Sequence, residues 1–473
     1  MNIHLAVLLG YSALLVGLGL WIGRRVKGTG DFFVANRQLG PGLIFATMLA
    51  ANIGAGSTVG ATGLGYRDGL AAWWWVGSAA IGSAVLAFWI GPRIRQLAAT
   101  HEFKTVGDFL EMRYGRNVRA LVSLLTWAGS LAIPAGQLIA IAFILNAVAG
   151  IPKTTGCLIG GGVVVVYFTA GGLLTSAWVN VVQLTVKLVG FLVALPFALK
   201  SIGGFAALAT VQPNNASYWN FWHGGPSGVV YLALLAPAFI VSPGLLQKIY
   251  GARDDRAVRL GVGLNAVGLL LYAAVPVMMG MIARASFPDL ATRELALPML
   301  LMHSVPPLVG GLGLAAVFSA EISAADAGLF MLTTSLSQDL YKRFLNPAAS
   351  DRHMLLVTRL AAVVCGGLAV GIAITATSII DVISLFYGLL SVALFIPILA
   401  GLFTRRAGAP EALASIACGV TTMVAVHVST DAKGTMGLTP ALIGLIAALV
   451  GFTIVWVSRL SRPTPSSKID PAR

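Results

Sequence analysis

The chain has 473 residues, of which 57% are hydrophobic and only 10% are charged, and its mean hydropathy is +0.87. A soluble globule of this size needs more polar surface than this composition provides. The composition therefore excludes a soluble protein and predicts an all-α polytopic membrane protein.

Apolar stretches of about 20 residues, the length that crosses a bilayer, recur along the chain and predict about thirteen membrane-spanning helices. The first stretch is expected to be a helix and not a cleaved signal, because no basic segment precedes it and Arg24 and Arg25 follow it. The helices are expected at residues 3–23, 43–66, 70–92, 120–149, 155–170, 177–199, 226–248, 259–283, 305–337, 355–377, 380–403, 409–428 and 438–458.

The distribution of basic residues predicts the orientation, since Lys and Arg accumulate in cytoplasmic loops. With the N-terminus outside, 24 of the 31 Lys and Arg residues lie in cytoplasmic segments. We therefore expect a multi-pass protein of the inner (plasma) membrane with an external N-terminus and a cytoplasmic C-terminus. These charges are spread over six short loops, so they do not form the single basic surface that nucleic-acid binding requires. The expected partners are the lipid bilayer and a small solute, and no obligate protein partner is evident.

Patterns typical of catalysis, nucleotide binding or metal binding do not occur in the sequence. Cys157, Cys365 and Cys418 lie in apolar stretches without a C-x-x-C pair, and a role as small core residues explains them. Neither an ATP-binding lysine motif nor a dinucleotide-binding glycine pattern is found. The sequence therefore predicts no enzyme, no cofactor and no metal beyond a transported cation, since an intramembrane enzyme would need a paired catalytic motif.

The helix expected at 43–66 contains polar and flexible residues in mid-span. In carriers, backbone that unwinds at mid-membrane frees carbonyl and amide groups to bind ions and solute. The alternative explanation is a face of small residues that packs closely against another helix. The residues concerned are Asn52, Gly54, Gly56, Ser57 and Thr58.

The helix expected at 226–248 carries two prolines, Pro237 and Pro243, each of which removes an amide donor and clashes with the preceding turn. This helix comes five helices after the one at 43–66, as a five-plus-five inverted repeat requires. Residues 1–473 are accordingly expected to form one transmembrane domain. Its parts are a first helix and loop (1–42), a first repeat (43–200), an inverted second repeat (226–404), two last helices (405–459) and a cytoplasmic tail (460–473).

Ionisable groups within membrane spans are costly and are therefore functional candidates. In the helix at 305–337, Ser323 and Asp326 share a face, whereas Glu321 points elsewhere. In the helix at 177–199, Asn180 and Lys187 lie seven residues apart on nearly one face. For Lys187, snorkelling or a structural ion pair with Glu321 explains the residue as well as a transport role does.

Eight short motifs carry a resemblance to a known family, and their number, order and placement matter more than any one of them. They are Asp31–Arg37, Ala50–Ile53, Thr105–Leu110, Arg113–Gly115, Tyr167–Leu173, Gln247–Lys248, Ala252–Asp254 and Asp339–Arg343. From about Asp31 to Arg406 the chain resembles the sodium:solute symporter family. The resemblance implies a LeuT-type inverted-repeat core with one extra helix before it and two after it.

The resemblance also implies a principal sodium site. Its ligands would be the backbone carbonyls of Ala50 and Ile53 and, on the helix at 305–337, the carbonyl of Ala320 and two adjacent hydroxyl residues. This chain provides Ser323 but then Ala324. The missing hydroxyl weakens sodium coupling, because each lost ligand must be replaced by water or by another group.

A second cation position in some family members uses an Asp at the place of Asn180, whereas this chain carries a carboxylate at Asp326. The exchange either preserves one negative charge near the cation path or marks a carboxylate that titrates with protons. Sodium, the ion that the family resemblance implies, is the expected coupling ion, and the proton is the alternative.

The sugar-transporting members of the family have a Glu-Gln pair and an Asn where this chain has Gly56, Ser57 and Leu235. The resemblance therefore favours an amino acid, a carboxylate or a similar metabolite over a sugar. The expected solute pocket is small and partly apolar. Its candidate residues are Gly56, Ser57, Thr58, Trp74, Gln137, Phe239 and Ser242.

Together, these patterns predict a secondary active transporter that couples a small organic solute to a cation by alternating access. The helices at 43–66 and 226–248 would move against a scaffold of the fourth, fifth, ninth and tenth helices. A non-transporting sensor with the same fold is the alternative from another class. Such sensors usually carry a signalling domain, whereas about fifteen residues follow the last expected helix here.

Overall fold

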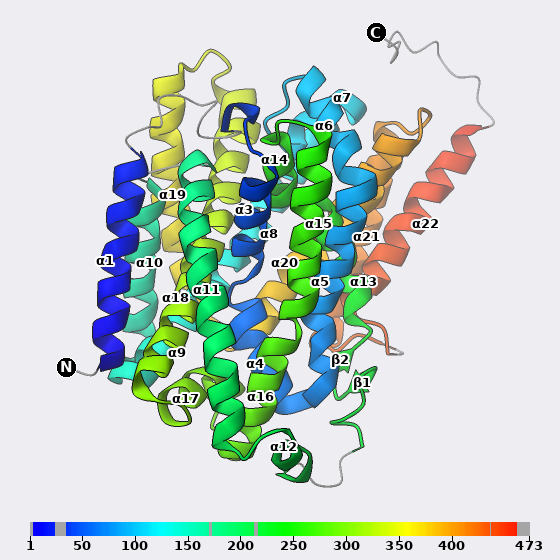
Figure 1. Ribbon diagram of the computed structural model, residues 1–473. Helices are drawn as coiled ribbons and strands as arrows, with labels where there is room; N and C mark the ends of the chain where they lie inside the picture. Colours follow the sequence, from blue (N-terminus) through cyan, green and yellow to red (C-terminus); the bar gives the residue numbers. More distant parts are fainter. Residues whose placement is uncertain (1–2, 24–34, 170–172, 212–215, 436, 461–473) are drawn as a thin grey trace.

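The computed structural model describes residues 3–23, 35–169, 173–211, 216–435 and 437–460. Nearly all of these residues form helices, most of which run between the two ends of an elongated bundle (Figure 1). Helix α1 begins at one end of the bundle, and α22 ends at the opposite end (Figure 1).

The first half of the chain forms the helices that surround the candidate site from one side. In chain order they are α1 (Ile3–Gly23), η1 (Ala35–Arg37), α3 (Pro41–Asn52), η2 (Gly56–Gly60), α4 (Ala61–Asp68), η3 (Gly69–Ala72), α5 (Trp73–Val85), η4 (Leu86–Ile90), α6 (Gly91–Thr100), α7 (Val106–Tyr114), α8 (Arg116–Ser130), α9 (Ala132–Ala149), α10 (Lys153–Thr169), α11 (Leu173–Ser201) and α12 (Phe205–Val211).

The second half begins with two short antiparallel strands, β1 (His223–Gly224) and β2 (Ser227–Gly228), and continues as helices. These are α13 (Tyr231–Val241), α14 (Pro243–Tyr250), α15 (Asp255–Tyr272), α16 (Ala274–Ser286), η5 (Arg293–Leu295), α17 (Ala296–His303), α18 (Pro307–Thr334), η6 (Ser335–Leu345), α19 (Asp351–Thr375), α20 (Ile379–Phe403), α21 (Ala409–Ser429) and α22 (Pro440–Leu460).

Ten helices of the described chain are long and apolar enough to cross a membrane, and three shorter apolar helices accompany them. The protein is therefore a multi-pass membrane protein. The shorter three are 3–15, 41–52 and 153–166. The expected number of thirteen spans and the expected division into repeats remain predictions, and residues 461–473 of the expected tail lie outside the described residues.

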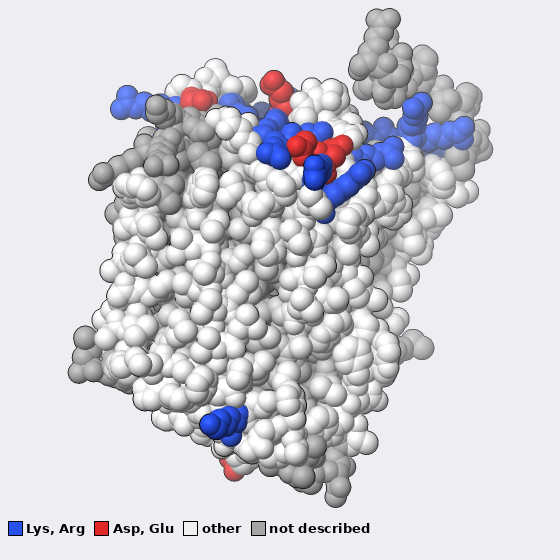
Figure 2. All heavy atoms as spheres, in the orientation of Figure 1, with Lys and Arg blue, Asp and Glu red and all other residues white. Residues whose placement is uncertain are grey.

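Charged side chains gather at one end of the molecule on the face drawn in Figure 2, and the broad middle zone of that face is uncharged. This banding is what a bilayer requires, because a charged side chain in hydrocarbon is costly. Apolar side chains such as Leu271, Leu192 and Phe88 are instead largely exposed on the bundle surface.

Several boundaries differ from those expected. The helix expected to end at residue 337 continues without a break from α18 into η6, so Asp339 is helical and does not lie in a loop. The helix expected to end at residue 248 continues to Tyr250, which places Lys248 inside α14 with its side chain buried. The two further residues of helix carry Lys248 from the expected end of the span into the core.

Helix α18 lies at the centre of the arrangement that forms the site, where it packs against α11, α9 and α3. Its side chains are buried almost without interruption from Gly310 to Thr334. A helix that is apolar all round belongs in the middle of a bundle. The two acidic residues Glu321 and Asp326 are therefore held where neighbouring helices must supply their partners.

Candidate functional site

The second expected span is interrupted at mid-helix. Helix α3 ends at Asn52, Ile53 adopts an extended backbone (φ −91°, ψ 94°), and the chain becomes helical again at η2. The amide of Gly54 donates to the Ser57 hydroxyl (3.0 Å), and the amide of Ser57 donates to the Gly54 carbonyl (2.9 Å). In a continuous helix these amides would donate to the carbonyls of Ala50 and Ile53. The break therefore leaves both carbonyl oxygens without their helical donors.

The seventh expected span is interrupted as well. Helix α13 ends at Val241, Ser242 leaves the helical region (φ −54°, ψ 119°), and α14 begins at Pro243. Proline has no amide hydrogen, so it is tolerated at the first turn of a new helix and not in the middle of a continuing one. Pro237, in contrast, lies inside α13. Only the second of the two prolines marks the break.

The freed carbonyls of α3 are occupied by a lysine from α11. The Lys187 ammonium donates to the Ala50 carbonyl (2.5 Å), to the Ile53 carbonyl (3.1 Å) and to the hydroxyl of Ser323 on α18. The side chain of Lys187 is fully buried. Three helices thus converge on one ammonium group.

Two of the other residues expected around the cation lie on α18. The Ser323 hydroxyl is 2.8 Å from the Ala50 carbonyl oxygen and 3.1 Å from that of Ala320. Ala324 lies on the wall of the adjoining cavity and brings no oxygen to the group. The structure therefore brings Ala50, Ile53, Ala320 and Ser323 together, and their role as cation ligands remains a prediction.

Glu321 faces away from Ser323 and contacts the second half of the interrupted span. Its Oε1 accepts a hydrogen bond of 2.7 Å from Thr58, and its Oε2 has no hydrogen-bond partner among the described residues. Glu321 is fully buried and interacts electrostatically with Lys187. It is thus the nearby acidic group for the buried ammonium, although its hydrogen bond joins it to Thr58.

Asn180 and Asp326 lie next to a second buried lysine. Asn180 donates to the Thr47 hydroxyl (3.0 Å), and Lys248 of α14 donates to the Thr47 carbonyl (2.9 Å). Asp326 interacts electrostatically with Lys248. The two residues expected at a second cation position therefore lie one turn of α3 away from Ala50, beside a buried lysine.

A cavity lies directly beside the break in the second span. Ser57, Gly56 and Gln137 are on its wall, as expected. Gln137 also holds the break in place, because its Oε1 accepts a hydrogen bond of 2.6 Å from the amide of Ala55. The remaining lining residues are Ala51, Asn52, Gly54, Trp75, Val76, Ala79, Ile133, Leu235, Phe239, Leu269, Ala324, Ile383 and Tyr387.

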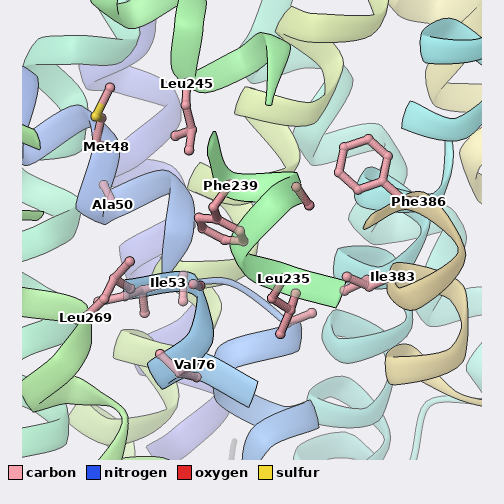
Figure 3. Packing of buried hydrophobic residues seen from close by; sticks show 14 of the residues in the cluster. Met48, Ala50, Ile53, Val76, Leu235, Phe239, Leu245, Leu269, Ile383 and Phe386 are labelled. Atoms are coloured by element: carbon pink, nitrogen blue, oxygen red, sulfur yellow. The ribbon is translucent and has the colours of Figure 1, made fainter. Parts of the chain in front are cut away.

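Phe239 of α13 lies between the interrupted span, with Ala50 and Ile53, and the side of α20 that carries Ile383 and Phe386 (Figure 3). Its ring contacts that of Tyr387, with 5.4 Å between the ring centroids. The cavity thus has one polar wall, formed by the interrupted span and Gln137, and one aromatic wall.

Two expected pocket residues lie elsewhere. Trp74 is off the cavity wall, because its indole donates to the Phe221 carbonyl (3.0 Å) and its ring packs against Phe221 and Trp222. Trp75 takes the place expected for Trp74. Thr58 is also off the wall, since its hydroxyl is turned to Glu321.

A second cavity shares walls with the first and leads away from it along α14. Phe239, Ala324 and Tyr387 line both cavities, and Ser242 and Lys248 line the second. Met331 is shared by the second cavity and a third, which reaches Asp339 beside α7 and α8. The three cavities therefore follow one another from the two breaks to the end of the bundle where α7 lies (Figure 1).

Some functional candidates could not be assigned from the sequence. Lys187 was recognisable as a buried charge, but its contacts join residues more than 130 positions apart. Trp75 carries no local signal that separates it from the two tryptophans before it. The burial of Lys248 had a weak signal, since Leu245, Leu246 and Ile249 around it continue the apolar helix.

The family model described as "Sodium:solute symporter family" matches residues 32–419. The chain belongs to this family. Members of the sodium:solute symporter family are membrane transporters and not enzymes, and sodium is the family's coupling ion. The resemblance of the sequence motifs to the family is thereby confirmed.

Comparisons with curated relatives and with solved structures extend the match. The chain is 27% identical to the sodium/pantothenate symporter of Escherichia coli (strain K12), covering 94% of this chain and 95% of the relative. It is 26% identical to high-affinity choline transporter 1 of Drosophila melanogaster over 82% of this chain, but spans only 65% of that relative.

The fold matches that of a Na⁺-coupled sialic acid symporter solved in a substrate-bound outward-open state. The TM-score is 0.81 at 19% sequence identity, and the match covers 97% of this chain and 98% of the other. The expected LeuT-type fold is therefore confirmed.

Proposed function

We propose that this chain is a secondary active symporter that carries a small organic solute together with a cation by alternating access. The observation that carries the proposal is that two interrupted helices, α3/η2 and α13/α14, border the same pair of cavities. Interrupted helices that line a cavity at mid-bundle provide backbone groups for binding and a place where the helix halves can move.

The solute we propose is an amino acid, a carboxylate or a similar small metabolite. The first cavity offers amide and hydroxyl groups from Asn52, Ser57 and Gln137 opposite the aromatic rings of Phe239 and Tyr387. A polar wall opposite an apolar wall suits a solute with one polar end and a short apolar body. Among the reported relatives, two are named for carboxylates, pantothenate and sialic acid, and one is named for choline.

The orientation we propose places the N-terminus outside and the C-terminus in the cytoplasm of the plasma membrane. Support comes from the concentration of Lys and Arg at one end of the face shown in Figure 2, since basic residues mark the cytoplasmic side. Helix α7 lies at this end. The cavities that lead from the breaks toward α7 would then form the cytoplasmic half of the transport path.

A ligand screen followed by counterflow tests the proposal. The purified protein is heated with amino acids, carboxylates, sugars and quaternary amines, because a ligand that binds the folded state raises the midpoint of unfolding. Each stabilising compound is then loaded into proteoliposomes, and exchange with external labelled compound is measured. A carrier exchanges solute across the membrane in this assay, whereas a sensor with the same fold binds solute without exchange.

A matched pair of variants assigns any exchange to the cavity. Phe239→Ala removes the aromatic wall and is expected to raise the solute concentration for half-maximal exchange by about tenfold or more. Phe205→Ala alters an exposed phenylalanine of α12 and should leave exchange unchanged. Exchange that is unaffected by Phe239→Ala would place the solute elsewhere.

A further inference from the structure

The Lys187 ammonium has as many acceptors as it has donors. A charged lysine carries three N–H groups and no acceptor. The three oxygens within reach are the carbonyls of Ala50 and Ile53 and the hydroxyl of Ser323. Each of the three N–H groups of Lys187 therefore has an acceptor at the break.

The same three oxygens belong to the set that the family resemblance implies for sodium. A sodium ion coordinated by them would lie within a few ångströms of Nζ, where two positive charges repel strongly in a poorly solvated interior. The chain also lacks one hydroxyl of the expected set, at Ala324, and that residue lies on the cavity wall. The residues present thus fit an ammonium group and do not fit a sodium ion beside it.

Ionisable groups from the surrounding helices balance the charge of Lys187. Glu321 of α18 interacts with it and is fully buried, while Lys248 of α14 is the second basic group nearby. Asp326 faces Lys248, and Tyr272 of α15 lies near Glu321. Two lysines and two carboxylates share this part of the core, so an added sodium ion would bring an uncompensated charge.

We propose that Lys187 is a tethered cation that takes the place of the sodium ion at the break of the second span, so that sodium does not bind at this position. The ammonium joins α11, α3 and α18 through the contacts that a bound ion would otherwise make. The inference refines the proposed cation coupling, and its consequence for transport rests on that proposed function. Any sodium dependence of this chain then arises away from Ala50, Ile53 and Ser323.

Sodium binding to the purified full-length protein tests the inference without any transport assay. The midpoint of thermal unfolding is measured in sodium chloride, potassium chloride and N-methyl-D-glucamine chloride at one ionic strength. The difference in unfolding midpoint between sodium and potassium should be the same for Ser323→Ala as for the wild type. A sodium-specific stabilisation of the wild type that Ser323→Ala abolishes would overturn the inference.

A designed gain of binding is the second arm of the test. The double variant Lys187→Ala/Ala324→Ser removes the ammonium and adds the missing hydroxyl, and it is expected to gain a sodium-specific shift on the order of 2 °C. Lys187→Arg keeps a positive charge and should gain none. Lys200→Ala removes an exposed lysine of the same helix and is the matched control. A double variant that folds and gains no sodium response would also overturn the inference.

The two arms separate this inference from the proposed function. Failure of solute exchange together with a sodium response of the double variant would refute the symporter and leave the tethered cation standing. If the wild type exchanges solute and its stabilisation by sodium requires Ser323, the symporter stands and the tethered cation is refuted. If the double variant does not fold, the comparison of wild type with Ser323→Ala still decides the matter.

Discussion

Thr58 of η2 donates a hydrogen bond of 2.7 Å to Glu321 of α18, and both side chains are fully buried. This contact ties the half of the second span beyond the break to the central helix of the bundle. It leaves the α3 half to be held by Lys187 and Ser323. The two halves of the interrupted span are therefore attached to α18 through different groups.

Removal of the Thr58 hydroxyl should destabilise the protein. Thr58→Val keeps the shape of the side chain and leaves a buried carboxylate without its donor, which costs about 1–3 kcal/mol. Thermal unfolding of the purified protein measures the loss, and Thr58→Ser should restore most of it.

Thr421→Val is the control for this prediction, because Thr421 is exposed on α21 and bonds only to its own helix. An equal loss of stability in both threonine variants would show that the contact with Glu321 contributes nothing.

Substitution of Gly54 should disturb the break itself. A Cβ atom at Gly54 would lie 2.4 Å from the Cβ of Ala324 and 2.8 Å from Oε1 of Gln137. Gly54→Ala must therefore push the interrupted span away from α18 and α9, at a cost of about 1–3 kcal/mol. Solute exchange should fall with it, because the cavity wall moves.

Gly367→Ala provides the comparison, since nothing lies within 4 Å of the Cβ position at this helical glycine of α19. Alanine favours the helix over glycine, so this variant should be as stable as the wild type or slightly more stable. If Gly54→Ala is as stable as Gly367→Ala, the close approach of the helices at the break does not require a glycine at this position.

Arg119 of α8 holds three carboxylates together at the end of the bundle where α7 lies. Its guanidinium is 2.8 Å from Asp108, 2.9 Å from Glu111 and 2.7 Å from Asp339. Arg119→Met removes the positive charge and leaves three acids in mutual repulsion, which should cost about 3–5 kcal/mol.

Arg116→Met tests whether any arginine of α8 has this effect, because Arg116 is exposed and its guanidinium lies over the ring of Phe344. Urea or thermal unfolding of both variants gives the comparison. A loss below about 1 kcal/mol for Arg119→Met would mean that the cluster is no stronger than a surface ion pair.

Stability at acidic pH should depend on Glu111. Burial by itself would raise the pKa of this carboxyl, but hydrogen bonds from Arg343 and Arg119 outweigh burial and lower the pKa below its ordinary value. A carboxyl with a lowered folded pKa contributes stability above its unfolded pKa, about 4.3, and this contribution is lost as the pH falls through the folded pKa.

Glu111→Gln should accordingly reduce stability at neutral pH and flatten the decline below about pH 4.3. Unfolding midpoints measured from pH 7 to pH 3 test this expectation. A variant whose midpoint keeps the full wild-type decline would assign the acid sensitivity to other carboxyls.

The interruptions of the two spans could be predicted because their causes are local. Pro243 cannot continue a helix, and Gly54 and Gly56 next to Asn52 favour an unwound backbone. Which residue of a run of identical residues faces the cavity depends instead on how the whole helix packs, and not on the local sequence. In the run Trp73, Trp74, Trp75, a shift of one residue turns the side chain by about 100°. Trp75, and not the expected Trp74, therefore lies on the cavity wall.

The partner of Lys187 could not be predicted for a related reason. The long flexible stem of lysine lets the ammonium reach groups well away from its own backbone, and the acceptors come from two other helices. The family resemblance implies that those acceptors bind a cation, and the apolar pattern places Lys187 in a membrane span, but no local pattern joins the two.

Gradient-driven uptake into proteoliposomes tests the central claim most directly. A solute identified by the ligand screen is supplied outside vesicles that hold an inward sodium gradient, an inward proton gradient, both gradients or neither. The account predicts accumulation above the external concentration when at least one gradient is present, and collapse to equilibration when both are abolished. Accumulation that persists without either gradient, or its absence under all four conditions, would contradict cation-coupled symport.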